Sequence, residues 1–599
     1  MSEPIWIPPT ELVERATMTR FMRTHGCSSY SELWRWSVED VERFWTALWK
    51  FFDVQADGDP SVVLASRTMP GARWFPNVRL SYAEHVFRDK RDEDVAILYA
   101  SESRWLSEWT WGDLRRETAA VRAGLVERGV GRGDRVAAYM PNIPETIAAF
   151  LATASLGAVW SSAAPEFGAR SVIDRFAQIE PKVLLAVEGF RYGGKDVDCI
   201  EKVNRIADEV KAPVAWLTDA GWQEGFAGDG DLSFERVPFD HPLWVLYSSG
   251  TTGLPKAIVH GQGGILLEHL KQMHLHLDLQ RGDRFFWFTT TGWMMWNLLV
   301  SGLLTDAAIV LYDGSPGTPS LNRLWDLAVE ARMTCFGTSA AFIHSCMKAD
   351  VEPGAGRDLS TLRSVGSTGS PLSPEGFRWV YDHVGRDTWL FSTSGGTDVC
   401  TAFVGGTPLE PVYLGELQAR ALGADLHAFD EQGAAVNDEV GELVITQPMP
   451  SMPVSFWGDQ DGSRYREAYF EMYPGVWRHG DWIRITDRGT AVIHGRSDST
   501  INRGGIRMGT AEIYRAVLAE DAIVDALVVD VPREGEENWM PLFVVLAEGR
   551  ELDDELVAAI RKRVREDCSP RHVPNEIVQI AEVPRSCRAR CWRCRSRRS

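Results

Sequence analysis

Hydrophobic residues recur in two alternating rhythms along the middle of the chain. Residues 112–130, GDLRRETAAVRAGLVERGV, place apolar side chains at helical spacing, and residues 132–142, RGDRVAAYMPN, follow as a short apolar strand closed by a turn. Residues 144–165 and 169–190 repeat this order of helix and then strand. The alternation predicts an α/β fold in which helices cover both faces of a parallel sheet.

The pattern changes toward the C-terminus. Residues 426–446, LHAFDEQGAAVNDEVGELVIT, read as short strands separated by Asp, Asn and Gly turns, which predicts an antiparallel or barrel-like part near 410–490. Residues 510–532 and 540–549 then read as a compact set of helices and strands. We therefore predict a large domain over residues 1–494 and a small α+β domain over residues 495–585.

Composition and charge narrow the class of protein. The 599 residues are 44% hydrophobic and carry a formal net charge of -20, so the chain is globular and its body repels nucleic acids and anionic membranes. The most apolar stretch, 147–160, is too short to span a bilayer, and the first residues lack the pattern of a signal peptide. Six scattered cysteines fit reduced thiols: Cys27, Cys199, Cys335, Cys346, Cys400 and Cys568. We expect a cytoplasmic protein.

One loop carries the first indication of chemistry. Residues 243–264, LWVLYSSGTTGLPKAIVHGQGG, combine an apolar run, a loop of Ser, Thr and Gly, and Lys256. Backbone amides, hydroxyls and a lysine suit phosphate oxygens. The lysine spacing excludes the GxxxxGK[ST] motif, which argues against a kinase or P-loop NTPase. Composition alone fits a flexible turn equally well.

The complete string is more specific than its composition. YSSGTTGLPKAIVH, at 247–260, resembles the phosphate-loop signature of the adenylate-forming acyl-CoA synthetases. Stretches that resemble further motifs of that family follow in the family's order: GSTGSPLS at 366–373, SGGTDVC at 394–400, WRHGDW at 477–482, and HGRSDSTINRGGIRMGTAEI at 494–513. Individually, Asp398, Asp481 and Arg507 could equally be a helix cap, a turn residue and a surface ion pair. Their joint order favours function.

The resemblance implies a role for each matched residue. The phosphate loop comprises Ser248, Ser249, Gly250, Thr251, Thr252, Gly253 and Lys256, and the adenine loop comprises Gly366, Ser367, Thr368, Ser370 and Pro371. Thr397 would contact phosphate, Asp398 would bind Mg²⁺, Asp481 and Arg496 would hold the ribose, and Asp498 would be the hinge. Gly505 would line the pantetheine tunnel, and Arg507 would bind phosphate. Lys256, Thr397 and Arg507 are the catalytic candidates.

Two other regions of the sequence indicate which acid is the substrate. The N-terminal extension, placed at residues 35–90, looks like the lead-in shared by the acetyl-, propionyl- and acetoacetyl-CoA synthetases. Residues 288–304 and 366–384 are most similar to the members that act on acetoacetate. By resemblance, the acid pocket comprises Trp293, Met294, Met295, Trp296 and Asn297, with the Asn297 amide able to bind a keto oxygen. For any one of these residues, a place in a core helix is equally compatible with the sequence.

The function implied is an ATP-dependent acid-thiol ligase. It would convert acetoacetate, ATP and coenzyme A to acetoacetyl-CoA, AMP and pyrophosphate through an acyl-adenylate, with Mg²⁺. Two alternatives remain: a ligase for another short acid, and an inactive nucleotide-binding protein whose basic tail binds a polyanion. The family's small domain is mobile, and it brings a C-terminal lysine to the acid and the α-phosphate.

The tail departs from the family at this lysine. Residues 586–599, SCRARCWRCRSRRS, stand where the Gly-Lys segment is expected, and no lysine follows Lys562. Three thiols without a fourth ligand disfavour zinc, and no nucleic-acid module accompanies the arginines. With suitable codons, the segment from Cys587 read in another frame gives Gly-Lys-Val-Leu-Glu-Val. A shifted reading frame is therefore the leading interpretation, and it predicts impaired adenylation.

Overall fold

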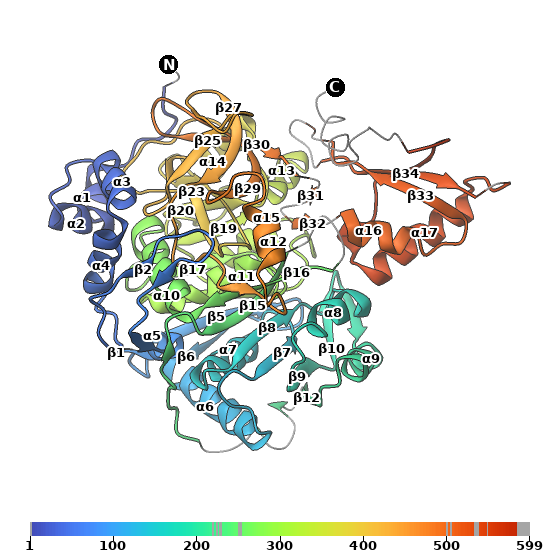
Figure 1. Cartoon of the computed structure of the whole chain (residues 1–599), viewed down its shortest axis with the longest axis horizontal. Coiled ribbons are helices and arrows are strands. Elements are labelled where there is room, and N and C mark those ends of the chain that lie inside the picture. The colour runs from blue at the N-terminus through green and yellow to red at the C-terminus, as the bar shows by residue number, and fades with distance from the viewer. Residues whose placement is uncertain are drawn as a thin grey trace.

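The large part of the chain is built on two mainly parallel sheets, which confirms the predicted α/β class (Figure 1). The computed structural model describes residues 3–218, 221–222, 226, 230–248, 254–498, 501–503, 506–508, 510–531, 533, 538–547 and 549–583. The phosphate-loop residues 249–253, Gly505 and the whole tail lie outside these ranges, so the predictions made for them are not addressed by the structure.

The first sheet contains the strands predicted from the alternating pattern. Its order is β13 (Gly221–Trp222), β12 (Val214–Thr218), β9 (Val183–Val187), β7 (Arg135–Tyr139), β8 (Val159–Ala163), β15 (Pro242–Ser248), β16 (Lys256–Gly261) and β28 (Ser455–Phe456). The neighbours from β12 to β15 pair in parallel, whereas β15 and β16 form an antiparallel hairpin. The hairpin brings Ser248 opposite Lys256.

Both faces of this sheet are buried, as an apolar parallel sheet requires. On β7, Val136 and Ala138 join the main core, while Ala137 and Tyr139 join a second cluster with α8 (Ala169–Phe176) and α9 (Ile200–Val210). Successive side chains of a strand point to opposite faces, so one short strand serves both layers.

The second sheet lies across the main core. Its order is β21 (Trp389–Ser392), β20 (Ser364–Thr368), β19 (Cys335–Ser339), β17 (Arg284–Trp287), β18 (Ala308–Asp313), β5 (Val95–Ser101) and β6 (Ser107–Thr110). All neighbours pair in parallel except β5 and β6. The carboxyl ends of β19, β20 and β21 therefore lie at one edge, where ligands bind in open α/β sheets.

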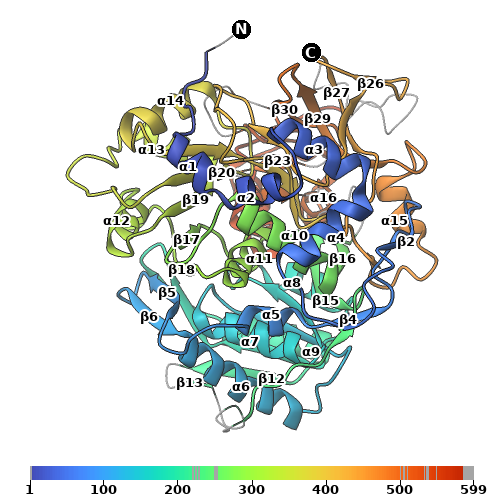
Figure 2. The ribbon, with the colours of Figure 1, turned by 90° about the vertical axis from the view of Figure 1, so that its left-hand side faces the viewer.

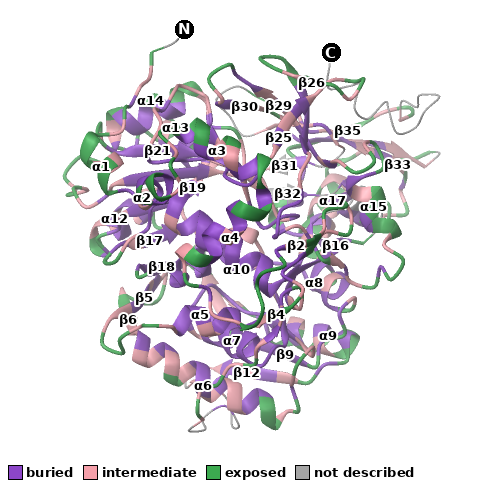
Figure 3. Cartoon of the chain, turned by 60° about the vertical axis from the view of Figure 1, so that its left-hand side comes forward, coloured by how far each residue is buried: buried purple, intermediate pink, exposed green. Residues whose placement is uncertain are grey.

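Helix α10 (Gln262–Lys271) is the most deeply buried helix of this domain, and all of its residues are buried (Figure 3). It continues into a π-helical turn, η1 (Gln272–His276). The other helices of the two-sheet region are α5 (Tyr82–Phe87), α6 (Trp111–Glu127), α7 (Pro144–Ser155), α11 (Met294–Val300) with the following 3-10 turn η2 (Ser301–Leu304), α12 (Arg323–Glu330), α13 (Ala340–Lys348) and α14 (Pro374–His383).

The N-terminal extension packs as helices against the large domain (Figure 2). Its helices begin before the predicted start at residue 35: they are α1 (Thr10–Arg15), α2 (Thr17–Thr24), α3 (Tyr30–Glu39) and α4 (Val41–Phe51), and we apply the name N-terminal extension to all four. The Tyr30 hydroxyl donates to the Arg420 carbonyl at 2.6 Å, and the Gly423 amide donates to Ser37 Oγ at 2.8 Å. Short strands complete this region and its surroundings: β1 (Asp57–Gly58), β2 (Leu64–Ser66), β3 (Arg73–Trp74), β4 (Val78–Leu80), β10 (Gly189–Tyr192), β11 (Lys195–Asp198) and β14 (Val237–Pro238).

The predicted antiparallel part forms a five-stranded sheet in the order β26 (Ala435–Val436), β25 (Leu426–Phe429), β27 (Val440–Ile445), β29 (Trp477–Ile485) and β30 (Ala491–Arg496). Within the described strands the sheet stays open, since β26 and β30 are its two edges. Beside it lie β22 (Ser394–Gly396), β23 (Thr401–Gly405), β24 (Ala419–Arg420) and α15 (Ser463–Tyr469).

The small domain has its own hydrophobic cluster, which includes Ile513, Leu542, Val544, Ile560 and Val564. Its elements are β31 (Ile501–Arg503), β32 (Ile506–Met508), α16 (Thr510–Val517), β33 (Ile523–Val528), β34 (Pro541–Leu546), α17 (Asp554–Asp567), η3 (Pro570–His572) and β35 (Glu576–Gln579). In Figure 1 it lies to one side of the large domain, next to α8. The boundary near residue 495 stays a prediction. Among the described residues, no helix is long and apolar enough to cross a membrane.

Candidate active site

Asp398 lies at the centre of the candidate site. Its side chain is fully buried, and Oδ1 accepts hydrogen bonds from Lys256 Nζ at 2.7 Å and from Ser248 Oγ at 3.3 Å. The β15–β16 hairpin supplies both donors, and Asp398 follows β22, so the fold joins two of the sequence motifs. A buried carboxylate needs such partners because its desolvation is costly.

Tyr469 is a member of this cluster that the sequence analysis missed. Its hydroxyl donates to Asp398 Oδ1 and accepts from Lys256 Nζ at 3.3 Å. The Tyr469 ring stacks on Trp477 with centroids 3.7 Å apart, and Lys256 Nζ lies 4.7 Å from its centroid. An aromatic residue at the end of α15 gave no chemical signal, because only the fold brings it to Asp398.

Asp481, Arg496 and Asp498 form the second charged group of the site. Arg496 Nη1 donates to Asp481 Oδ2 at 3.0 Å, and its Nη2 donates to Asp498 Oδ2 at 2.5 Å. Burial alone would lower the pKa of Arg496, but the Asp481 and Asp498 carboxylates outweigh it and raise that pKa above its ordinary value. Arg496 is therefore a permanent cation between two carboxylates.

Gly480 makes room for this arrangement. Its φ of +87° lies in the left-handed region, and a Cβ added there would lie 2.8 Å from both Arg496 Nη2 and Asp498 Oδ2. Glycine is required here both for the backbone conformation and for the close approach of the two side chains.

The predicted adenine loop lies at the carboxyl end of β20. Gly366 packs against aromatic rings, since an added Cβ would lie 2.7 Å from Trp287 and 2.8 Å from Phe391. Thr368 Oγ1 donates to the Thr393 carbonyl at 2.8 Å, whereas Ser367 is fully buried. Ser370 is half-buried and Pro371 is exposed just after the strand. The end of β20 therefore lies beside the segment that leads to Thr397.

A small cavity adjoins Thr397, and we call it the acid cavity. It is lined by Ser162, Phe167, Arg175, Leu246, Tyr247, Thr291, Gly292, Trp293, Met294, Asn297 and Thr397. The Asn297 side chain is 1% exposed, and its Nδ2 has no hydrogen-bond partner in the described part of the chain. A buried amide donor of this kind is costly unless a ligand satisfies it.

The other two pocket candidates lie outside the lining of this cavity. Trp296 is fully buried and stacks on Trp160 with centroids 6.2 Å apart, while its Nε1 donates to Asn142 Oδ1 at 3.1 Å. Its place is in the core, as one reading of the sequence allowed. Met295 packs against the main core.

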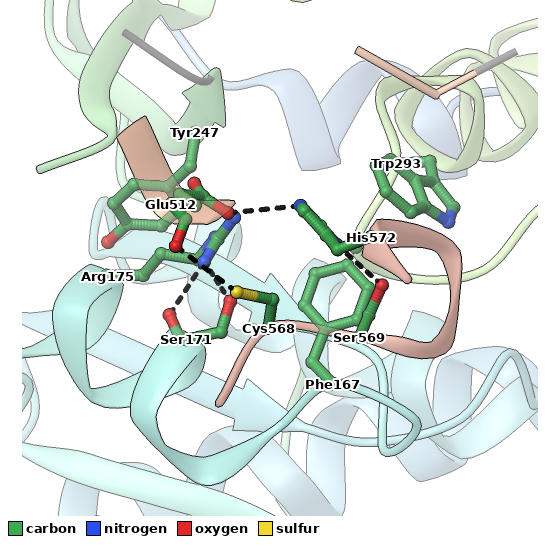
Figure 4. A pocket seen from close by; sticks show the side chains of 10 residues that line it. Phe167, Ser171, Arg175, Tyr247, Trp293, Glu512, Cys568, Ser569 and His572 are labelled. Carbon is green, nitrogen blue, oxygen red and sulfur yellow. Dashed lines mark hydrogen bonds and ion pairs between the residues drawn. The ribbon is translucent and has the colours of Figure 1, made fainter. Parts of the chain in front are cut away.

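A second cavity lies between the two domains, and we call it the interdomain cavity (Figure 4). The large domain contributes Phe167, Ser171, Arg175, Tyr247, Gly292 and Trp293, and the small domain contributes Glu512, Cys568, Ser569 and His572. Trp293 borders both cavities and meets Phe167 edge to face at 5.3 Å. Phe167, Arg175, Tyr247 and Gly292 also line both cavities, so the acid cavity directly adjoins the domain interface.

Ion pairs join the domains at this interface. Glu512 Oε1 lies 3.4 Å from Arg175 Nη2, its Oε2 lies 3.3 Å from His572 Nε2, and all three side chains are largely buried. Although burial raises the pKa of Glu512, Arg175 and His572 outweigh this effect and lower it to about 2. Beside them, Arg515 Nη1 lies 2.7 Å from Asp174 Oδ2. Sequence patterns could not identify the two pairs that cross between the domains, Arg175 with Glu512 and Asp174 with Arg515, because the partners are more than 300 positions apart.

Arg507 lies on β32, where its backbone pairs with Asn502. Its side chain, like Gly505, lies outside what the structure describes. The predicted phosphate and pantetheine contacts of these two residues remain predictions.

Comparisons with known proteins agree with this geometry. The family model described as AMP-binding enzyme matches residues 85–452, and the model described as acetyl-coenzyme A synthetase N-terminus matches residues 30–86. Acetoacetyl-coenzyme A synthetase of Rhizobium meliloti (strain 1021) is 44% identical over 605 residues, which cover 97% of this chain and 93% of that protein. Acetoacetyl-CoA synthetase of Danio rerio is 39% identical, with coverage of 97% and 91%.

A solved structure gives the same result. Acetoacetyl-CoA synthetase from Streptomyces lividans superposes with a TM-score of 0.81 at 50% identity, covering 98% of this chain and 94% of that one. The chain therefore belongs to the acetoacetyl-CoA synthetase family of AMP-binding enzymes, which are AMP-forming acid-thiol ligases.

Proposed function

We propose that this chain ligates acetoacetate to coenzyme A at the expense of ATP, with AMP and pyrophosphate as the other products. The observation that carries the choice of acid is the buried Asn297 amide in the acid cavity. Trp293 and Met294 give this cavity an apolar wall, and Asn297 offers one donor to a keto oxygen. Acetoacetate combines a short carbon chain with such an oxygen.

In the first half-reaction, a carboxylate oxygen of the acid forms a bond to the α-phosphorus of ATP, and the bond from that phosphorus to the bridging oxygen of pyrophosphate breaks. Charge cancellation and alignment dominate such a transfer. Lys256 supplies a cation, and Thr397, which lines the acid cavity, supplies a hydroxyl beside the reacting carboxylate.

Mg²⁺ enters as part of the ATP substrate. Mg²⁺ in nucleotide sites is held by one or two carboxylates together with phosphate oxygens and water, so the single carboxylate of Asp398 fits this need. Lys256 and Tyr469 donate to Asp398 Oδ1, so both donors lie beside the place that we assign to MgATP. Asp481 and Arg496 are the proposed ribose contacts.

In the second half-reaction, the thiol sulfur of coenzyme A attacks the acyl carbonyl, a carbon–sulfur bond forms, and the bond to AMP breaks. The thiol proton leaves to solvent. The interdomain cavity reaches Trp293 from the side of the small domain, so we assign it as the approach of the thiol. Six free cysteines among the described residues, five of them buried, support a reducing, cytoplasmic location.

We further propose that adenylation is slow in this chain, because residues 586–599 replace the segment with the expected lysine. Loss of one preorganised donor at a transition state costs ~10²-fold to 10³-fold in rate. The matched test replaces the segment after Arg585 with the alternate-frame reading, Ser-Gly-Lys-Val-Leu-Glu-Val. ATP–pyrophosphate exchange should rise by that factor, while thioester formation from supplied acetoacetyl-adenylate should change little. Equal exchange rates would refute the proposal.

The choice of acid is tested in the chain with the replaced tail. Pyrophosphate release is measured with acetoacetate, butyrate, propionate and acetate, for wild type and for Asn297→Leu. Loss of one hydrogen bond to the keto oxygen should lower kcat/KM for acetoacetate ~10-fold to 10²-fold and leave butyrate nearly unchanged. Asn204→Leu, at an exposed position of α9, is the control. An unchanged ratio between the two acids removes Asn297 from the account.

The same assays separate the alternatives. A higher kcat/KM with propionate or acetate than with acetoacetate would indicate a ligase for another short acid. Absence of acid-dependent pyrophosphate release with either tail, together with salt-sensitive binding to a polyanion that is lost on deleting residues 586–599, would indicate a binding protein.

A further inference from the structure

Two buried histidines, His260 and His269, contact the backbone of the turn that carries Thr397 and Asp398. It connects β22 and β23, and it contains Cys400 in the left-handed region at a φ of 51°. A hydrogen bond from the Cys400 amide to the Gly396 carbonyl, at 2.9 Å, closes the turn internally. A non-glycine residue in this conformation needs support from its surroundings.

His260 provides support at Asp398. It is fully buried on β16, and its Nε2 lies 3.0 Å from the Asp398 carbonyl oxygen. The indole Nε1 of Trp244 lies 3.3 Å from His260 Nδ1. An indole only donates, so Nδ1 accepts and Nε2 carries the proton. His260 therefore donates to the backbone of the residue whose carboxylate we assign to MgATP.

His269 provides the second support, at Cys400. It is fully buried on α10, and its Nε2 lies 2.7 Å from the Cys400 carbonyl oxygen. A carbonyl only accepts, so Nε2 carries the proton and Nδ1 accepts from Ser301 Oγ at 2.5 Å. Ser301 is the first residue after α11. The chain of contacts thus reaches the helix that carries the acid-pocket amide.

We infer that His260 and His269 are positioning residues, which fix the backbone of the Thr397–Asp398 turn through the carbonyls of Asp398 and Cys400. Neither side chain is assigned a contact with substrate. Each acts through the turn, and His269 also ties the turn to α11. This inference deepens the proposed function, because it assigns the residues that place the carboxylate for MgATP.

His276 offers a matched control. It lies on η1, directly after α10, it is 3% exposed, and its Nδ1 lies 3.0 Å from the Gly406 carbonyl. His276 therefore makes the same kind of buried bond to a backbone carbonyl, but at a residue beyond the far end of β23. Its loss should lower stability without moving the turn.

The test measures ATP binding by calorimetry over a range of Mg²⁺ concentrations, in the full chain. It requires neither acid, coenzyme A nor the tail lysine, so it stands even if the proposed ligase activity fails. We expect His260→Leu and His269→Leu to raise the Mg²⁺ concentration for half-maximal ATP binding ~10-fold or more, because a small displacement of a placed group is costly. His276→Leu should match them in lost thermal stability and retain the wild-type Mg²⁺ response.

Conservative variants complete the test. The amide nitrogen of Gln can occupy the place of Nε2, so His260→Gln should restore the wild-type Mg²⁺ response, whereas His260→Asn, which is too short, should retain the defect. If the Leu variants do not fold, this Gln and Asn pair decides the question. The inference is overturned if the His260 and His269 variants show the same Mg²⁺ response as wild type or His276→Leu.

Discussion

Lys256 Nζ lies 2.7 Å from Asp398 Oδ1, at a position where the carboxylate is fully buried and the lysine is 16% exposed. Removal of one member of such a pair leaves an uncompensated buried charge, which costs about 3–5 kcal/mol. We use the lower end of this range because Lys256 is partly exposed. We therefore expect Lys256→Met to lower the free energy of unfolding by about 3 kcal/mol and, in the chain with the replaced tail, to abolish ATP–pyrophosphate exchange. Denaturant unfolding and the exchange assay check this outcome.

The double variant distinguishes charge from packing. Lys256→Met with Asp398→Asn removes both charges and should recover most of the lost stability, but no exchange activity. Lys182→Met is the control, since its pair with Asp134 at 3.0 Å is partly exposed and should contribute less than about 1 kcal/mol. If the double variant is no more stable than Lys256→Met, the buried charge is not the cause.

Gly480→Ala tests the arrangement around Arg496. The substitution carries the strain of a positive φ, about 1–2 kcal/mol, and its methyl group also collides with Arg496 and Asp498. We expect ATP to bind ~10-fold more weakly, because displacement of a placed group is costly.

Gly489→Ala is the matched control for this prediction. Gly489 has a φ of +84°, and no atom lies within 4 Å of an added Cβ. Both variants should lose the stability that the positive φ costs, Gly480→Ala should lose more because of its collision, and only Gly480→Ala should weaken ATP binding. Equal ATP affinities in a calorimetric titration would contradict the proposed role of this cluster.

Much of the fold was predictable from the sequence because its signals are local. The alternation of apolar runs over residues 112–190 located α6, β7, α7, β8, α8 and β9 in the correct order. The motifs likewise pointed to Lys256 and Asp398, which the structure brings together. Sequence spacing could not identify Tyr469 or the pair of Glu512 and Arg175, since tertiary packing alone creates those contacts. The placement of Trp296 in the core was equally undecidable, because an indole suits either environment.

Glu512→Gln tests the interface between the domains. The substitution leaves Arg175 and His572, which are 11% and 7% exposed, without their shared carboxylate. We expect a loss of about 3 kcal/mol in the docking of the small domain. Hydrogen–deuterium exchange in α8 and α16 should then accelerate. Glu566→Gln on α17, at an exposed pair with Lys562, should leave exchange unchanged.

The lowered pKa of Glu512 makes the docking of the small domain depend on pH. Because its folded value of about 2 lies below the ordinary 4.5, the carboxylate stabilises the docked state above pH 4.5, and this stabilisation is lost as pH falls through 2. Wild type should therefore approach the Glu512→Gln variant as the pH is lowered over this range. A constant difference between the two proteins down to pH 2 would contradict the assignment.

Two buried histidines, His85 and His276, predict that acid lowers the folding stability at a higher pH than the titration of Glu512 does. Burial lowers the pKa of His85 to about 4 and that of His276 to about 3. Each ring also accepts a backbone amide at Nε2, from Gln55 at 3.0 Å and from Leu422 at 3.3 Å, and protonation would remove that acceptor. The unfolded chain binds these protons near pH 6.5, so the stabilisation is complete above that pH and declines as the pH falls toward 4 and then 3.

The expected slope is about 1.4 kcal/mol per pH unit for each histidine. Urea midpoints between pH 7.5 and 5 measure it. His85→Gln and His276→Gln should each flatten the curve. A curve for wild type that is level over this range would refute the prediction.

The hydrogen bond from Tyr30 to the Arg420 carbonyl joins residues 390 positions apart. The aromatic helices of the N-terminal extension therefore leave the ribosome well before the segment around Arg420 to which Tyr30 binds. At 5–20 residues per second, these helices wait ~20–80 s for it. Until that segment emerges, Trp34 lacks the Ala424 carbonyl to which its indole donates and the Arg420 guanidinium that lies over its ring.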